Sequence, residues 1–163
     1  MRDGQFVLSV LVNNQFGVLT RISSLFSRRG FNIDSLTVGE TEDPAFSRMT
    51  IQTTWDECTK NQIVRQLEKL HDVQKVQVMK PSETVIRELV LVKIKVGGKL
   101  SELTEAANVF RATVVDLTAE TMSIQITGES TKIDGFLDYV KGYGILEICR
   151  TGVTAIGRGS ETF

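Results

Sequence analysis

Hydrophobic residues along the chain follow two different periods, and the two alternate in a regular order. Between residues 18 and 29 they recur at helical spacing, at Val18, Leu19, Ile22, Leu25 and Phe26. Between residues 46 and 55 they alternate with polar residues, which is typical of a strand with one buried face. Residues 6–12 are apolar at nearly every position, which indicates a strand covered on both faces.

Read in order, these patterns predict the same set of elements twice. The first half gives strand, helix, strand, strand, helix, strand, over residues 6–12, 18–29, 32–41, 46–55, 56–70 and 73–79. A polar stretch with a proline, residues 80–84, then interrupts both periods and reads as a linker. The same order returns over residues 88–96, 100–111, 113–117, 121–127, 130–141 and 145–156, with a break expected near Gly152.

Two runs of strand-helix-strand-strand-helix-strand predict an α+β protein made of two ferredoxin-like βαββαβ domains with antiparallel sheets. We expect the domains to cover residues 1–80 and 85–163, and each to bury a core of its own. Helices cover only one face of such a sheet, yet residues 6–12 are apolar on both sides. A second cover is therefore expected, and a partner subunit is the simplest candidate.

Composition narrows the class of function. The chain has 163 residues, is 41% hydrophobic and carries a formal net charge of −1. This charge is not basic enough to indicate a nucleic-acid partner, and no apolar run is long enough to span a membrane. The first residues have no signal-peptide pattern, and Cys58 and Cys149 lie far apart. We therefore expect a cytoplasmic protein with reduced thiols.

The usual catalytic combinations are nearly absent. His71, the single histidine, precedes Asp72 at a predicted helix end, where a solvated terminus is the simpler interpretation. Cys58, Gly97-Gly98 and the acidic residues near Glu40 likewise read as a structural cysteine, a turn and a solvated loop. No metal-ligand array and no acid–base pair stands out. The sequence predicts a binding or regulatory protein and no catalytic residues.

The turn at residues 13–17 is the best candidate for a ligand site. A strand ends at two asparagines, and the helix starts directly after Gly17. The first amides of a helix lack intrahelical partners, so a carboxylate could be held there. The alternative is that Asn and Gly stand here only because they tolerate tight backbone geometry. Spacing alone leaves both interpretations open.

Four stretches allow a family to be recognised. They are VLVNNQFGVLTRISSLFSRRGFNIDSLTVG, SRMTIQT, RELVLVKIKV and KIDGFLDYVKGYGILEICRTGVTAIGRG, and together they cover almost the whole chain. The first half resembles an ACT domain, a module that senses small molecules in amino-acid metabolism. The whole chain resembles the bacterial regulatory (small) subunit of acetohydroxyacid synthase, also called acetolactate synthase.

This resemblance implies a function without catalysis. Such a subunit binds and activates a large catalytic subunit, and it confers feedback inhibition by valine in branched-chain amino acid biosynthesis. Thiamine diphosphate, Mg and FAD are expected on that catalytic subunit, and no cofactor or metal is expected in this chain. Valine is expected between the ACT domains of a homodimer. The implied effector residues are Asn14, Gly17, Val18 and Leu19, with Asn32 and Ile33 from the neighbouring subunit.

Two other classes of function would require features that the sequence should then show. A stand-alone amino-acid-binding ACT protein, such as a transcriptional regulator, would need a helix-turn-helix segment or a basic face, and neither is visible. An enzyme on a ferredoxin-like fold would need a convergent acid–base set. The sequence offers none.

Overall fold

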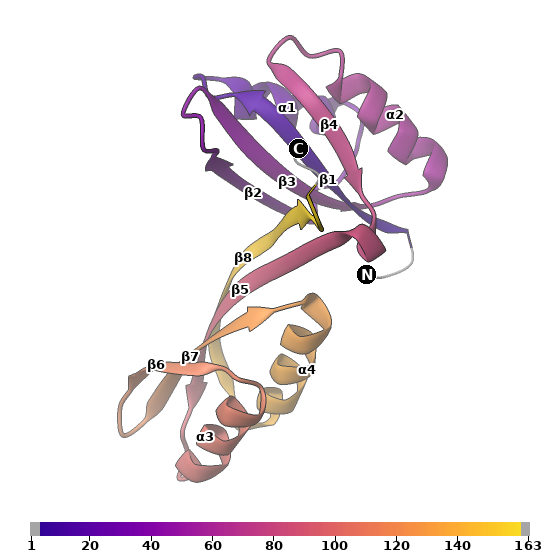
Figure 1. Ribbon diagram of the computed structural model, residues 1–163. Helices are drawn as coiled ribbons and strands as arrows, with labels where there is room; N and C mark the ends of the chain where they lie inside the picture. The colour runs from indigo at the N-terminus through magenta and orange to yellow at the C-terminus, as the bar shows by residue number, and fades with distance from the viewer. Residues whose placement is uncertain (1–3, 161–163) are drawn as a thin grey trace. The chain divides into compact units, whose positions relative to one another are not determined.

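The structure is a computed structural model that describes residues 4–160 (Figure 1). Contacts divide the chain into two compact units. The first contains residues up to Val85 together with those from Val153 onward, and the second runs from Ile86 to Gly152. No helix among residues 4–160 is long and apolar enough to cross a membrane.

The first unit is a four-stranded antiparallel sheet in the order β2-β3-β1-β4, with α1 and α2 on one face (Figure 1). Its elements are β1 (Gln5–Asn13), α1 (Val18–Arg28), β2 (Ser35–Glu40), β3 (Phe46–Thr54), α2 (Glu57–Leu67) and β4 (Val73–Met79). Alternation along β1 sends Leu8 and Val10 towards the helices, where Ile22, Phe26 and Ile63 complete the core. The helical spacing at the start of α1 therefore sets which helix face packs on the sheet.

The second unit repeats this arrangement with the order β6-β7-β5-β8. After the short 3-10 helix η1 (Pro81–Glu83) come β5 (Thr84–Lys95), α3 (Leu100–Val109), β6 (Thr113–Leu117), β7 (Thr121–Gly128), α4 (Ser130–Val140), the 3-10 helix η2 (Lys141–Tyr143) and β8 (Ile145–Gly157). Val92, Ile124 and Phe136 are among the fully buried core residues. The prediction of two ferredoxin-like units is confirmed.

The second face of the first sheet has a cover that the sequence did not predict. Val7 and Ser9 of β1 point to this face and are fully buried. The end of β8 lies over it, with Val153 and Ala155 buried, and Ser35 Oγ accepts a hydrogen bond from the Val153 N–H at 3.0 Å. Part of the cover therefore comes from the same chain, so the apolar β1 does not by itself require a partner subunit.

The end of β8 also changes the division of the chain. We expected residues 85–163 to form the second domain, but residues from Val153 onward group with the first unit. The division falls after Gly152, where a break in the strand was expected. The strand continues through this residue, but its φ of +83° is a left-handed conformation that favours glycine. A strand therefore runs from one compact unit into the other with a local distortion between them.

Two strand starts were predicted wrongly: β5 begins at Thr84, four residues before the predicted residue 88 and inside the predicted linker, and β2 begins at Ser35 and not at residue 32. Just before Ser35, hydrogen bonds from side chains take the place of strand-ladder bonds. The Thr53 hydroxyl donates to the Asn32 carbonyl oxygen at 2.7 Å, and Asn32 Nδ2 donates to Asp34 Oδ1 at 2.8 Å. Local side-chain hydrogen bonds of this kind compete with a strand ladder.

Candidate functional site

The turn between β1 and α1 is fixed by bonds to neighbouring segments. The Asn14 N–H donates to the Ala45 carbonyl at 2.8 Å. Its side-chain Nδ2 donates to Glu40 Oε1 and to the Pro44 carbonyl, both at 3.0 Å. Because the amide nitrogen is engaged, the group that Asn14 can offer a ligand is its carbonyl oxygen, an acceptor suited to an ammonium.

Gly17 forms the start of α1 with a φ of +84°, a conformation that favours glycine. No side chain caps the helix there. The first regular helical bond runs from the Arg21 N–H to the Gly17 carbonyl. The amides of the first turn, such as that of Leu19, therefore have no intrahelical acceptor and can serve an anionic group.

Arg21 lies beside this turn, although it was not among the residues implied by the sequence. A Cβ placed on Gly17 would lie 3.1 Å from Arg21 Nη1, so the guanidinium lies directly beside the glycine. Arg21 Nε donates to Asp72 Oδ2 at 2.6 Å, which holds the side chain in position. The spacing Gly17-x-x-x-Arg21, one helical turn, was the signal available in the sequence.

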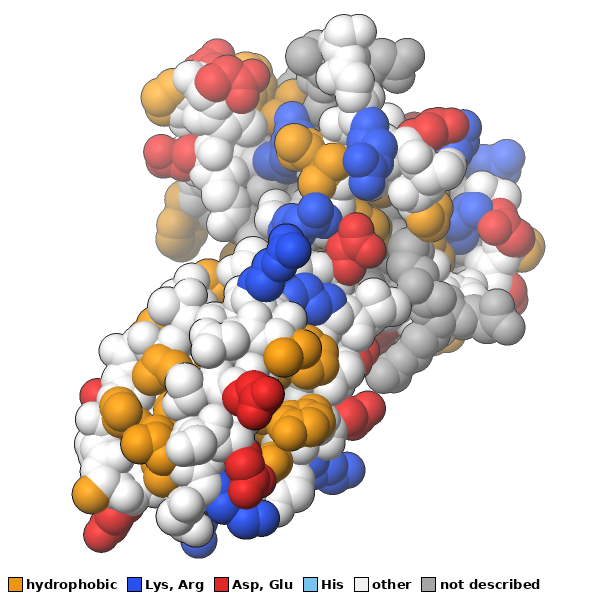
Figure 2. Space-filling model, turned by 60° about the horizontal axis from the view of Figure 1, so that its bottom comes forward, with side chains coloured by type: hydrophobic (Ala, Val, Ile, Leu, Met, Phe, Trp, Pro, Cys, Tyr) orange, Lys and Arg blue, Asp and Glu red, His pale blue; other side chains and the backbone are white. Residues whose placement is uncertain are grey.

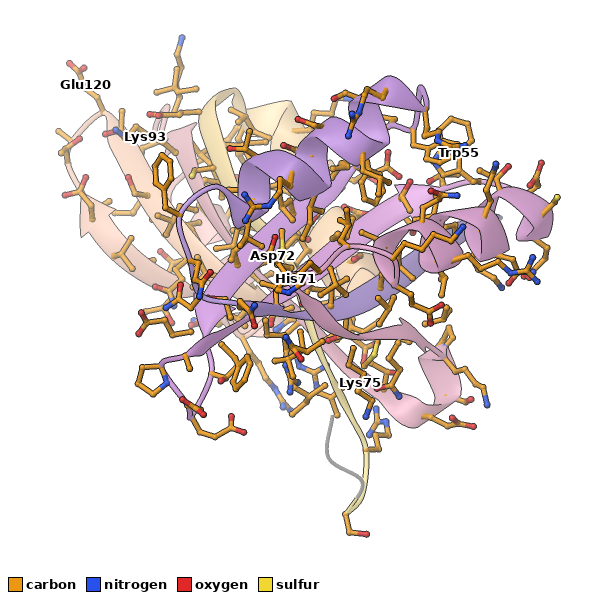
Figure 3. The ribbon with its side chains drawn as sticks, turned by 90° about the horizontal axis from the view of Figure 1, so that it is seen from above. Trp55, His71, Asp72, Lys75, Lys93 and Glu120 are labelled. Carbon is orange, nitrogen blue, oxygen red and sulfur yellow. The ribbon has the colours of Figure 1, made fainter. Side chains whose placement is uncertain are left out.

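The same contact explains the His71-Asp72 pair. The two residues lie in the turn before β4, close to α1 (Figure 3). Asp72 pairs with Arg21, and His71 is exposed. Asp72 therefore has a positioning role at the turn.

The hydrophobic residues of the turn differ sharply in exposure. Val18 is 3% exposed and packs in the core, so only its backbone can meet a ligand. Leu19 is 47% exposed and Phe16 fully so. An apolar contact from this chain must therefore come from Leu19 or Phe16. Sequence periodicity missed Phe16 because it lies in the turn, outside any element.

Asn32 and Ile33 are not brought near this turn within one chain. Asn13, at the end of β1, pairs with Phe46, whereas Ser35, at the start of β2, pairs with Gln52. The two places are six residues apart along β3, which corresponds to about 20 Å. One chain therefore carries the two predicted halves of the effector site at opposite ends of its sheet.

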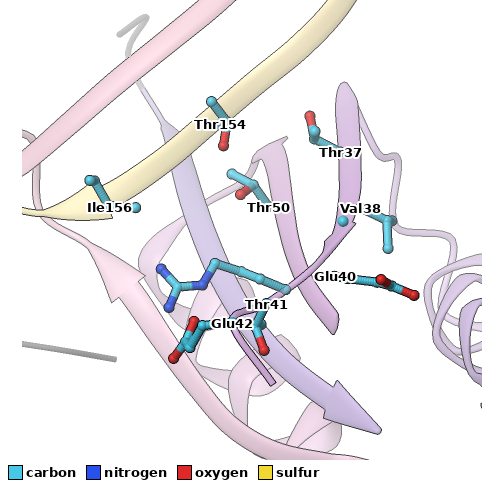
Figure 4. Close-up of a pocket in the computed structure, with 10 residues that line it drawn as sticks. Thr37, Val38, Glu40, Thr41, Glu42, Thr50, Thr154 and Ile156 are labelled. Carbon is cyan, nitrogen blue, oxygen red and sulfur yellow. The ribbon is translucent and has the colours of Figure 1, made fainter. Parts of the chain in front are cut away.

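The first unit also contains a cavity of about 380 Å³ on the face away from the helices (Figure 4). None of the six predicted effector residues lines it. Its lining comes from β2, the loop after β2, β3 and the end of β8: Thr37, Val38, Gly39, Glu40, Thr41, Glu42, Arg48, Thr50, Thr154 and Ile156. From the sequence, the acidic residues of this set were expected to form a solvated loop.

The remaining sequence candidates carry no visible chemistry. Cys58 and Cys149 are exposed and not disulfide-bonded. Between residues 4 and 160, no three metal-ligating side chains gather in one place. Gly97 and Gly98 form a turn with positive φ, closed by a bond from the Lys99 N–H to the Val96 carbonyl at 2.8 Å.

The second unit holds one strong polar contact. Arg150 Nε and Nη2 donate to the two carboxylate oxygens of the buried Glu88, at 2.8 and 2.7 Å. The bond to Glu88 raises the pKa of the Arg150 guanidinium further, and Asp134 lies 3.5 Å away.

On the face in Figure 2, exposed hydrophobic side chains lie in groups among charged and polar ones, without defining a site.

Known families match both units. Residues 8–75 match the AHAS small subunit-like ACT domain, and residues 87–159 match the small subunit of acetolactate synthase. Together the two matches cover most of the chain, on either side of the predicted linker.

Individual proteins agree with these matches. The chain is 44% identical to a probable acetolactate synthase small subunit of Methanothermobacter thermautotrophicus, over 99% of this chain and 98% of that protein. It is 43% identical to the acetolactate synthase isozyme 3 small subunit of Escherichia coli, over 95% and 96%. The crystal structure of the Thermotoga maritima small subunit superposes with a TM-score of 0.90 at 36% identity, covering 99% and 100%. The resemblance predicted from the sequence is confirmed: this chain belongs to the family of acetolactate synthase small subunits.

Proposed function

We propose that this chain acts in the cytoplasm as a dimer that binds valine between two first units and regulates a large catalytic subunit. Bound to that subunit, it raises catalytic activity, and valine bound to the dimer lowers it again. Thiamine diphosphate, Mg and FAD belong to the catalytic subunit in this proposal. The chain itself supplies binding surfaces and no reacting group.

The observation that carries the proposal is the separation of the two halves of the effector site. Asn14 and Gly17 lie about 20 Å along the sheet from the segment at Asn32. A single valine cannot contact both within one chain. A second copy placed antiparallel would bring Asn32 and Ile33 of one chain to the turn of the other, at two equivalent places.

Each group of valine has a matching partner in this arrangement. The carboxylate meets the uncapped amides at the start of α1 and the Arg21 guanidinium beside Gly17. The ammonium meets the side-chain carbonyl oxygens of Asn14 and Asn32. The isopropyl group contacts Leu19, which is half-exposed, and the partly buried Ile33.

Gly17→Asp tests this site in the assembled enzyme. The new Cβ would approach Arg21 Nη1, and the new carboxylate would occupy the place of the ligand's own. We expect the valine concentration for half inhibition to rise by at least about tenfold, a loss of roughly 1.4 kcal/mol in binding. Activation of the catalytic subunit should largely remain. The measurement is activity of the reconstituted complex across a valine titration.

Gly159→Asp is the matched control, because Gly159 has a φ of +80° and open space around its Cβ position. In both variants a non-glycine residue must adopt the left-handed conformation, which costs about 1 kcal/mol of backbone free energy. Only Gly17→Asp should lose inhibition. Wild-type valine sensitivity in a well-folded Gly17→Asp complex would remove the turn from the effector site.

A further inference from the structure

We propose that Glu40 is a positioning residue of the effector site: it fixes the side-chain amide of Asn14 and thereby makes the site select an α-ammonium group over an α-oxo group. The inference rests on the valine site proposed above. It adds the chemical class of effector that this site accepts, an α-amino acid and not the corresponding 2-oxo acid. Glu40 lies at the end of β2 and is not among the effector residues implied by the family resemblance.

The orientation of the Asn14 amide follows from its two partners. Its nitrogen, Nδ2, lies 3.0 Å from Glu40 Oε1 and 3.0 Å from the Pro44 carbonyl oxygen. The oxygen and nitrogen of an amide have nearly the same shape, so only their hydrogen-bond partners tell them apart. An ionised carboxylate and a backbone carbonyl can only accept, and the atom that faces both must therefore be the donor.

Both hydrogens of the Asn14 amide are thus used within the chain. An NH₂ group has two N–H bonds, and it meets two acceptors here. What remains for a ligand is the carbonyl oxygen, which accepts a hydrogen bond from an ammonium group and repels the oxygen of an oxo group. Turning the amide over would reverse this preference, because the NH₂ group would then face the ligand.

Glu40 makes the larger contribution to holding the amide. A hydrogen bond to an ionised acceptor is roughly twice as strong as one between neutral groups. The backbone of Glu40 is itself fixed, because it pairs with Ser47 in the regular ladder between β2 and β3. The carboxylate therefore approaches Asn14 from a rigid strand end.

The second acceptor is held by the loop between β2 and β3. The Asp43 side chain accepts from the Ala45 N–H at 2.9 Å, and the Thr41 hydroxyl donates to the Asp43 carbonyl oxygen at 2.9 Å. The Phe46 N–H donates to the same carbonyl oxygen at 3.0 Å. These bonds hold the loop, and with it the Pro44 carbonyl, in place.

The substituent on the α-carbon is the group that the site can use to distinguish the two classes of ligand. Valine and its 2-oxo acid share the carboxylate and the isopropyl group, so contacts with the start of α1 and with Leu19 cannot tell them apart. An ammonium is a charged donor, whereas an oxo group is a neutral acceptor. A hydrogen bond to a charged group corresponds to about tenfold or more in affinity.

Isothermal titration calorimetry of the full chain measures this selection with three probes. Valine carries the ammonium group, 3-methyl-2-oxobutanoate carries an oxo group in its place, and 3-methylbutanoate carries neither. The ratio of the Kd of 3-methylbutanoate to the Kd of valine reports the contacts of the ammonium group. We expect this ratio to be at least about tenfold in the wild type, and the oxo acid to bind no better than 3-methylbutanoate.

Two substitutions at Glu40 separate positioning from a structural role. Glu40→Ala removes the stronger acceptor, so the ratio should fall at least about threefold, while the Kd of 3-methylbutanoate changes by less than about twofold. A merely structural role would raise the Kd of every probe together. Glu40→Gln keeps an oxygen that can accept from Asn14, and it should recover most of the ratio.

Glu42→Ala is the matched control. It removes the same charge from the same part of the chain, and in Figure 4 the side chains of Glu40 and Glu42 extend away from each other. This variant should keep the wild-type ratio. The double variant Asn14→Ala, Glu40→Ala should show the same ratio as Asn14→Ala alone, because Glu40 acts through Asn14.

An unchanged ratio in Glu40→Ala would overturn the proposal, and so would an equal loss in Glu42→Ala. A further loss when Glu40→Ala is added to Asn14→Ala would mean that the carboxylate acts on the ligand directly, which also contradicts it. The valine site fails in a different way. If Gly17→Asp leaves the Kd of valine unchanged, the effector does not bind at the turn, and the role of Glu40 is wrong with it.

Discussion

Replacing Val153 by Asp tests whether the end of β8 is a real part of the first unit. Val153 is 2% exposed, and it is held by two bonds to β2. Ser35 Oγ accepts from its N–H, and the Thr37 hydroxyl donates to its carbonyl oxygen at 2.8 Å. Val153→Asp keeps the backbone N–H and carbonyl oxygen that make these two bonds and changes only the buried side chain.

The size of the effect follows from burial. Removing the buried isopropyl group costs about 2 kcal/mol. Placing a carboxylate where water is excluded costs at least about 2 kcal/mol more. Together they correspond to roughly a thousandfold change in an opening equilibrium. Because the core on the helix side of the sheet is untouched, we expect the end of β8 to detach while both units stay folded.

Amide hydrogen exchange of the full chain measures this opening. In Val153→Asp, the amides of Val153 and Ala155 should exchange far faster than in the wild type, while those of Leu8 and Ile51 in the core change little. Ile156→Asp introduces the same charge three residues away, at a position that is 55% exposed. In this variant the amides of Val153 and Ala155 should exchange at the wild-type rates. Equal protection in the two variants would mean that Val153 does not anchor the strand end.

Three other results are expected. A fragment of residues 1–80, which sequence alone suggests can fold, should unfold at lower denaturant than one carrying residues 153–160 on a linker, because it lacks the cover over Val7. Arg150→Met should destabilise the second unit by about 2 kcal/mol in urea unfolding, less than a fully buried pair, and the double variant Arg150→Met, Glu88→Leu should recover most of it. Light scattering of the isolated chain at micromolar concentration should give at least a dimer, and a monomer would count against the shared effector site.

The sequence predicted the fold well where each element carries its own periodic pattern. The strand over residues 73–79 and that over 113–117 were predicted with the bounds the structure has. Errors gathered where side chains replace backbone ladder bonds, as at Asn32. Others fell where a strand continues beyond its own unit, as at Val153. Periodicity reports which face of an element is buried, and it does not report which distant segment covers that face.

At the proposed effector site the sequence indicates a turn but not the contacts that fix it, for a related reason. Positive φ at Gly17 could be anticipated from a glycine in a tight turn. The Arg21–Asp72 pair could not, because it joins residues 51 positions apart in sequence. Val18 was expected to face the ligand, but helical periodicity places its side chain in the core. The family resemblance implies the region of the proposed effector site, and the three-dimensional contacts decide which atoms in it are available to a ligand.

The separation of the two half-sites has a consequence for regulation. If valine contacts the turn of one chain and Asn32 of another, it binds the dimer and has only half a site on a monomer. Its binding free energy then adds to the stability of the dimer, by about 2.7 kcal/mol for each site at a valine concentration one hundred times its Kd. Asp72 holds Arg21 beside the turn, where Arg21 is the residue best placed to bind the carboxylate of valine. The stabilisation of the dimer should therefore require a ligand that carries a carboxylate. Valine would thus act on the catalytic subunit by selecting one arrangement of two regulatory chains, and its effect is bounded by its difference in affinity between that arrangement and any other.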